Sequence, residues 1–118
     1  MWDCRGSVVK LGPLRGEVWM CAFPWMGTHP AVVLAANGIA QPPPAVTVAL
    51  ITDTPGLQAT RVALGPDSGL TRYDEPYVDC TSLHTVAKTS LRLCRGRLDV
   101  SEMASVEHAS RRALGLQA

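Results

Sequence analysis

The chain has 118 residues, of which 47% are hydrophobic and 18% charged, and its formal net charge is +1. This length and composition predict one globular domain that buries its own core. The near-neutral charge excludes any argument for nucleic-acid binding from bulk charge, although a local basic groove is compatible with it. The sequence has neither an apolar run long enough to span a membrane nor a signal-peptide stretch, so we expect a cytoplasmic protein without a membrane partner.

The first thirteen residues show no hydrophobic period and are interrupted by glycine and proline. We therefore expect a flexible tail over residues 1–13 and a single domain over residues 14–118. The four cysteines are Cys4, Cys21, Cys80 and Cys94. Their spacing lacks a Cys-x-x-Cys pair, so we predict no metal site, no cofactor and no disulfide, and interpret them as small buried hydrophobic residues.

Alternating apolar side chains in the domain predict a series of short strands. The predicted strands are residues 16–23, 31–36, 45–51, 60–64, 76–80 and 91–98. Pro24 and Pro30 bound a predicted loop over residues 24–29, and residues 82–88 are expected to contain a short helical turn. This order indicates a small, mostly antiparallel barrel or half-barrel.

The C-terminal segment is predicted to be a helix that packs on this barrel. Asp99 and Glu102 have the spacing of a capping box, and Gly115 is expected to end the helix. Glu107 and Arg111 are expected to form a pair on the solvent side. The predicted buried stripe consists of Met103, Val106, Ala113 and Leu114.

Two positions are candidates for chemistry on physical grounds. His29 precedes Pro30, which holds its backbone extended, and histidine exchanges a proton near neutral pH. Thr52 follows a buried strand, where its hydroxyl can hydrogen-bond a phosphate oxygen. Each also has a plain structural interpretation, since a lone loop histidine is often a surface residue. The segment Thr52–Pro55 is equally compatible with a turn whose side chains bond their own backbone.

The segment Arg15–Trp19, the segment His29–Leu34 and the strand ending in Thr52 together resemble the MazF/PemK family of toxin endoribonucleases. That family has Arg-Gly-Asp/Glu-hydrophobic-Trp, then Arg-Pro before a valine-rich strand, then a strand that ends in Thr or Ser. Further similarity is found at Gly69-Leu70, Leu83–Lys88, Leu91, Gly96–Leu98 and Ala113–Leu116. The similarity covers residues 14–116, and the ordered set is more specific than any one motif.

The resemblance implies an SH3-like β-barrel of the MazF/PemK/CcdB type. It implies a homodimeric mRNA interferase that cleaves single-stranded RNA at specific sequences without metal. In the family the 2′-hydroxyl of the substrate attacks the phosphate and leaves a 2′,3′-cyclic phosphate and a 5′-hydroxyl. A cognate antitoxin neutralises the enzyme. The RNA class, whether messenger, ribosomal or transfer RNA, is left open by the sequence.

The resemblance assigns catalysis to His29 and Thr52, and Thr52 matches the family directly. His29 stands where the family has arginine, which grips a phosphate bidentately and carries a permanent charge. Histidine instead serves as general acid or base, binds RNA less effectively, or marks a loss of activity, and the sequence leaves these three readings open. Some relatives place a catalytic Arg and Asp where this chain has Asp79 and Thr81, and we expect these two residues to contact the RNA.

The cation missing at position 29 must come from elsewhere, and Arg15, Arg61 and Arg72 are the candidates, each also explicable as a solvated surface charge. Trp25 is a candidate for base stacking, or for an apolar contact to the antitoxin or second subunit. Two other functions compete with the nuclease. One is a catalytically impaired homologue that only binds antitoxin, and the other is a toxin of the same fold that acts on a protein such as gyrase.

Overall fold

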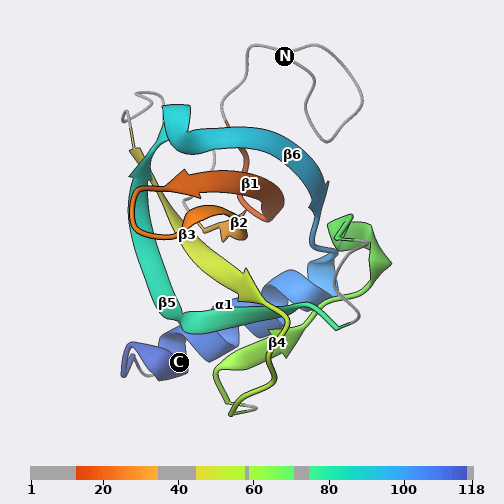
Figure 1. The fold of residues 1–118 in the computed structure, drawn as a ribbon. Helices are drawn as coiled ribbons and strands as arrows, with labels where there is room; N and C mark the ends of the chain where they lie inside the picture. The colour runs from red at the N-terminus through yellow and green to blue at the C-terminus, as the bar shows by residue number, and fades with distance from the viewer. Residues whose placement is uncertain (1–12, 35–44, 58, 71–74, 117–118) are drawn as a thin grey trace.

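The computed structural model describes residues 13–34, 45–57, 59–70 and 75–116. These residues form one six-stranded antiparallel sheet followed by one α-helix (Figure 1). The elements are β1 (Glu17–Phe23), β2 (Gly27–Val33), β3 (Ala45–Thr52), β4 (Arg61–Ala63), the 3₁₀ helix η1 (Pro66–Ser68), β5 (Tyr77–Ala87), the 3₁₀ helix η2 (Lys88–Ser90), β6 (Leu91–Arg97) and α1 (Val100–Ala113). The strand order is β4-β5-β3-β2-β1-β6. The predicted fold class, mostly β with a C-terminal helix, is confirmed.

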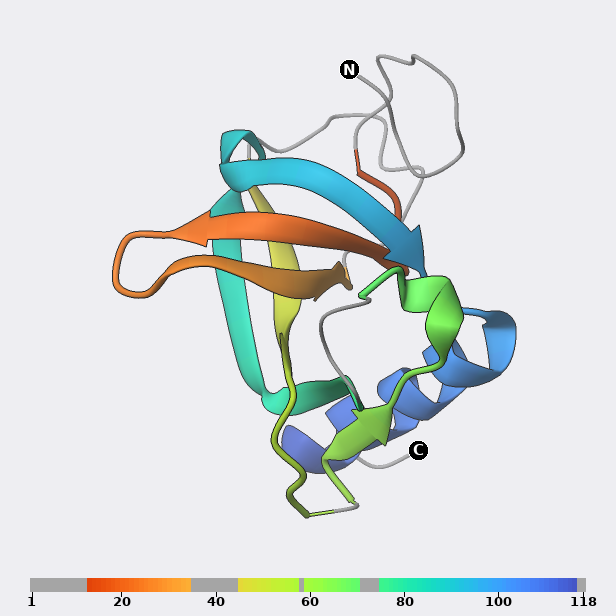
Figure 2. The same cartoon turned by 45° about the vertical axis from the view of Figure 1, so that its right-hand side comes forward.

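Two apolar cores lie on opposite faces of this strongly curved sheet (Figure 2), because side chains alternate along each strand. The helix-side core includes Val106 and Ala109 of α1, which lies against β4 and β5. The hairpin-side core is built around the β1–β2 hairpin. Its buried members are Trp19, Cys21, Phe23, Ala31, Val33, Val46, Val48, Val86 and Leu91, with Met26, Leu50 and Cys94 packed against it.

The loop predicted over residues 24–29 is wrong, because the connection is a tight turn and β2 begins already at Gly27. Gly27 has φ of +77°, a left-handed conformation that glycine adopts without strain and that reverses the chain at once. His29 therefore lies in a strand and pairs with Cys21 of β1. Pro30 is tolerated within β2 although it has no backbone N–H to donate. It pairs with Met20 of β1, and the ladder with β3 starts one residue later, at Ala31.

The break predicted between residues 76–80 and 82–88 is also wrong, because β5 is one continuous strand through both segments. A register irregularity in the β3–β5 ladder, between Ala49 and Ile51, absorbs the change in curvature while pairing continues on both sides. The short helical turn comes later, as η2. The strands predicted at 16–23, 45–51, 60–64 and 91–98 are confirmed to within a residue at each end. Residues 35 and 36 of the other predicted strand lie outside the described residues.

The capping box of α1 is confirmed, since Asp99 accepts from the backbone of Glu102, whose side chain accepts from the backbone of Asp99. The predicted stripe is partly wrong. Val106 is buried, but Leu114 is 59% exposed, because the helix ends before it and Ala109 fills the space against the sheet. Gly115, with φ of +74°, follows the helix end as predicted.

Cys21 and Cys80 are buried and free, as predicted. Cys94 of β6 packs against the hairpin-side core. Cys4 and the predicted tail up to residue 12 lie outside the described residues. Within the part of the chain that the structure describes, no helix is long and apolar enough to cross a membrane.

Candidate functional site

Three side chains form a row across β2, β3 and β5. The β2–β3 ladder ends at the pair Ala31–Leu50, so His29 and Thr52 each lie two residues beyond its last pair, on strands that are neighbours in the sheet. On the other side of β3, Thr52 pairs with Tyr77. The structure therefore places the two residues that the sequence singled out for catalysis on neighbouring strands, just beyond the end of their ladder, and pairs Tyr77 with one of them. We call this set the His29–Thr52–Tyr77 row.

The row lies on the hairpin side of the sheet. Leu50 of β3 packs against the hairpin-side core, so Thr52, two residues further on, projects from the same face. Ala31 belongs to that core as well, which places His29 on this face by the same alternation. All three residues of the row are half-buried. They consequently border the core where it meets solvent, a position in which a side chain is held rigidly yet reached by a substrate.

The hydroxyl of Thr52 is fixed by the turn that follows it. Its Oγ1 accepts a hydrogen bond from the backbone N–H of Thr54 at 3.2 Å. The structural interpretation of this segment, a turn whose side chain bonds its own backbone, is thus confirmed. Because the oxygen acts as an acceptor here, the hydroxyl hydrogen can still be donated to a phosphate oxygen.

Arg61 braces the same turn from β4. Its Nη1 donates to the carbonyl oxygen of Thr54 at 2.7 Å, and its Nη2 lies 3.5 Å from Oδ2 of Asp79. The stem of Arg61 packs so closely on Gly56 that a Cβ there would lie 2.9 Å from Nε. Asp79 is held in turn by Thr81, whose backbone N–H and hydroxyl donate to Oδ1 at 3.0 and 2.6 Å. Three of the predicted RNA-binding residues therefore form one network beside Thr52.

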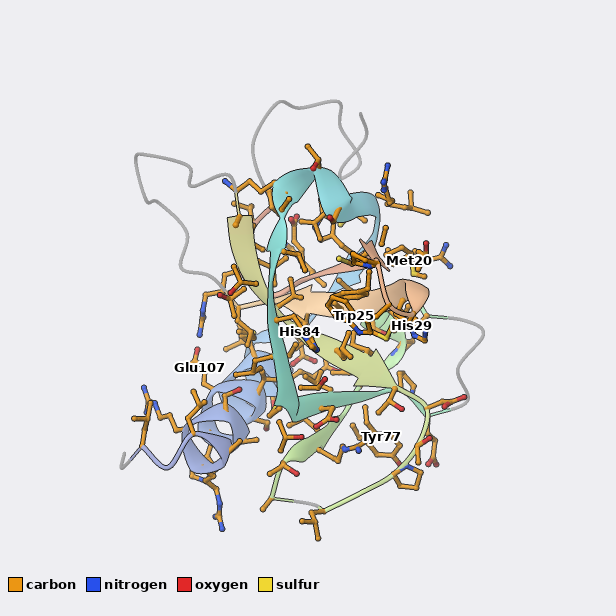
Figure 3. All side chains as sticks on the ribbon, turned by 60° about the vertical axis from the view of Figure 1, so that its left-hand side comes forward. Met20, Trp25, His29, Tyr77, His84 and Glu107 are labelled. Atoms are coloured by element: carbon orange, nitrogen blue, oxygen red, sulfur yellow. The ribbon has the colours of Figure 1, made fainter. Side chains whose placement is uncertain are left out.

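Trp25, another predicted RNA-binding residue, stands in a cluster of three aromatic rings. Its ring centroid lies 5.3 Å from that of Phe23 and 5.2 Å from that of His84. Phe23 and His84 also contact each other, at 5.7 Å. Figure 3 shows Trp25 and His84 turned toward one another from the hairpin and from β5. We call this set the Phe23–Trp25–His84 cluster.

The remaining predicted cations do not join the row. Arg15 precedes β1, whereas His29 pairs near the far end of that strand, and Arg15 forms an ion pair with Glu107 of α1. The hydrogen bond and charge of Arg15 lower the pKa of Glu107. Glu107 therefore has a tertiary partner besides the helical neighbour that the sequence suggested. Arg72 lies outside the described residues.

Sequence reasoning missed Tyr77 and His84. Both belong to β5, and their pairing with β3 becomes visible only when that strand is known to be continuous. Tyr77 donates its hydroxyl to Glu75 at 2.8 Å, and this hydrogen bond raises the pKa of the phenol. His84 belongs to Leu83–Lys88, a segment that resembles the family. The contact between its ring and that of Trp25, however, is visible only in the fold.

The arrangement offers an imidazole and two hydroxyl groups on one face, and a guanidinium that is hydrogen-bonded to the turn after Thr52. Such a set can bind a phosphate, hold it through hydrogen bonds and move a proton beside it. In the described parts of the chain, no group of three or more His, Cys, Asp or Glu side chains is arranged to hold a metal ion.

Solved structures with a similar fold include several toxins. A mycobacterial endoribonuclease is 27% identical with a TM-score of 0.78, over 92% of this chain and 96% of that one. A mycobacterial endoribonuclease in complex with its cognate antitoxin is 28% identical with a TM-score of 0.79, over 90% and 98%. The fold also matches the Mycobacterium tuberculosis toxin MazF-mt6, at 24% identity and a TM-score of 0.77, over 86% and 99%.

Among curated proteins, none matches the chain by sequence. The model of one family does match it over residues 14–114, nearly the whole of the domain predicted from the sequence. The barrel expected from the resemblance agrees with the solved structures above, whose chains are covered almost completely. The chain belongs to the PemK-like, MazF-like toxins of type II toxin–antitoxin systems.

Proposed function

We propose that this chain is a sequence-specific endoribonuclease that cleaves single-stranded RNA. The observation that carries the proposal is that His29 and Thr52 lie on one face of neighbouring strands, each two residues beyond the pair Ala31–Leu50. Similar solved structures that are endoribonucleases support it. The solvent border of an apolar core is also a suitable place for RNA, whose bases and phosphates need apolar and polar partners respectively.

In the proposed reaction, the 2′-oxygen of the substrate attacks the adjacent phosphorus and the bond from phosphorus to the 5′-oxygen breaks. A general base removes the proton of the 2′-hydroxyl, and a general acid protonates the departing 5′-oxygen. The products are a 2′,3′-cyclic phosphate and a 5′-hydroxyl end. Because the substrate supplies its own nucleophile, we propose that no metal ion is needed to generate one.

The residues of the site divide these tasks. The imidazole of His29 exchanges the proton, as general acid or general base. Thr52 donates its hydroxyl hydrogen to a non-bridging phosphate oxygen, where negative charge develops. Arg61 replaces part of the positive charge that the family places at position 29, and its bond to the carbonyl of Thr54 fixes the turn that positions Thr52. Asp79 and Thr81 support Arg61 at the edge of the site.

The test is cleavage of a panel of single-stranded RNAs by the purified protein in the presence of a chelator, with the ends of the fragments mapped. We expect cyclic-phosphate and 5′-hydroxyl ends at a defined sequence. Thr52→Ala is expected to lower kcat by about 100- to 1,000-fold, the effect of losing one oxyanion donor. Thr47→Ala is the matched control, since Thr47 lies on the same strand but on its other face. Intact RNA throughout the panel would refute the nuclease.

The variant His29→Arg distinguishes between the possible roles of His29. If His29 is a general acid or base, arginine abolishes proton exchange and the rate falls by about 100- to 10,000-fold, as it does for His29→Ala. A rise above the wild-type rate would instead identify His29 as a weakened phosphate binder and favour the impaired homologue. Inhibition of gyrase supercoiling by a wild-type protein that leaves RNA intact would favour the protein-directed toxin.

We also propose that the chain acts as a cytoplasmic homodimer that a cognate antitoxin neutralises. The antitoxin complex of a similar structure supports the second partner. Exposed apolar side chains, among them Leu57, Leu114 and Leu116, offer surface for association. Light scattering coupled to gel filtration tests the dimer, and a monomer at micromolar concentration would refute it.

A further inference from the structure

Trp25 is exposed to solvent, but its ring is held in place by contacts with two other rings. Its side chain is 61% accessible to solvent, whereas Phe23 beneath it is only 2% accessible. The two rings are tilted at 49°, and the ring of His84 meets that of Trp25 at 46°. An indole held by two other rings loses little further conformational entropy when a ligand covers its open face.

His84 is itself held in place. Its Nε2 lies 3.2 Å from Oγ of Ser82 on the same strand, and its ring meets that of Phe23 edge-on at 62°. Phe23 belongs to the hairpin-side core. The position of the Trp25 ring therefore depends on β5, far away in the sequence, as well as on its own turn.

The Phe23–Trp25–His84 cluster lies on the same face as the His29–Thr52–Tyr77 row. His84 pairs with Val48 of β3, and Val48 and Leu50 both contact the hairpin-side core. Thr52 follows on that face. Val48 and Thr52 are four residues apart along β3, which corresponds to about 13 Å at the usual rise of a strand. A single strand of RNA with its phosphate at Thr52 thus reaches the cluster with a base a few nucleotides away at most.

We infer that the exposed face of Trp25 is a nucleobase platform and that His84 is the positioning residue that holds it. This inference rests on the proposed function, because it assumes that single-stranded RNA occupies this face. Base stacking on an aromatic ring suits any sequence, since every base has a π-face. The platform therefore contributes affinity and places the strand, while the choice of cut site belongs to other contacts.

The experiment measures binding of a fluorescent, cleavage-resistant 2′-O-methyl RNA oligonucleotide of mixed sequence, together with versions in which one base at a time is abasic. We expect Trp25→Ala to weaken binding by about 5- to 150-fold, the usual range for loss of one stacked base. One abasic position should weaken the wild type similarly and have no further effect on Trp25→Ala. Thr47→Ala serves as the control and should bind like wild type.

His84 is tested through Trp25. We expect His84→Ala to raise KM for a cleavable RNA with little change in kcat, and His84→Phe, which keeps a ring beside the indole, to restore most of the affinity. Urea unfolding of each variant establishes that the fold is retained. If His84→Phe binds as weakly as His84→Ala, the positioning role by ring contact is refuted.

Failure of the inference and failure of the proposed function are separate outcomes. If the wild type cleaves RNA while Trp25→Ala binds every oligonucleotide as tightly as wild type, the platform is refuted and the nuclease stands. If the wild type shows the abasic dependence but cleaves nothing, the platform stands and the reaction is refuted. Trp25→Ala that weakens only antitoxin binding or dimerisation, with RNA affinity unchanged, also overturns the platform.

Discussion

Replacing Arg61 by methionine tests whether this residue braces the site. The change keeps the Cγ that packs near Gly56 but removes the guanidinium, whose Nε and Cζ also lie near Gly56. The charge-assisted bond to the Thr54 carbonyl, 2.7 Å long, is typically worth about 1.5–3 kcal/mol. The ion pair with Asp79, at 3.5 Å and about one-fifth exposed, adds at most about 1 kcal/mol. We expect Arg61→Met to lower the free energy of unfolding by about 1.5–4 kcal/mol.

Urea unfolding measures this loss, and RNA cleavage by the same variant measures its functional effect. Because the turn after Thr52 loses its brace, kcat should fall together with stability. Arg112→Met is the matched control, since Arg112 is exposed on α1 and its loss changes the net charge equally. A double-mutant cycle with Asp79→Asn should give a coupling of about 1 kcal/mol.

The opposite result is equally informative. If Arg61→Met changes the free energy of unfolding by no more than about 0.5 kcal/mol, as a surface substitution does, the bracing role is refuted. Should that variant also lose RNA affinity, with a salt slope reduced by about one, Arg61 contacts a phosphate directly.

Three further predictions follow from contacts outside the row. Asp99→Ala removes one half of the capping box with Glu102 and should destabilise the protein by about 1 kcal/mol in urea unfolding. An unchanged midpoint of the urea transition would contradict this. Glu107→Gln should be less stable than wild type by up to about 1 kcal/mol at pH 7. Because Arg15 lowers the pKa of Glu107 below its usual 4.5, this difference should shrink as the pH falls through the lowered value, and a difference that grows in acid would contradict the pairing. Burial raises the pKa of the Cys80 thiol, so iodoacetamide at pH 8 should leave it unmodified in the native protein and label it in urea, as peptide mass spectrometry can measure.

The substitution of histidine for arginine at position 29 has a structural counterpart in this fold. An arginine would supply both a fixed charge and a bidentate grip. Here His29 lies on β2 and Arg61 on β4, and under the proposed function the imidazole exchanges the proton while the guanidinium supplies the fixed charge. The variants of His29 and Arg61 described above measure these two contributions separately.

The sequence by itself determined the fold class, most strand positions and the helix with its capping box. These depend on local periodicity and on side chains a few residues apart, which the sequence displays directly. It also singled out His29 and Thr52, through the proline after one and the strand before the other. Local signals failed at the turn before His29, because a single glycine at φ of +77° reverses the chain more tightly than the two prolines suggest.

Only the tertiary structure decided which residues meet. Tyr77 and His84 join the site because β5 pairs with β3 on both sides of a register irregularity, and this pairing depends on hydrogen bonds between distant segments. For the same reason Arg61 is the arginine that bonds to the turn after Thr52, whereas Arg15 forms an ion pair with Glu107 of the helix. Register across a sheet is set by the packing of both its faces at once, and no single segment carries that information.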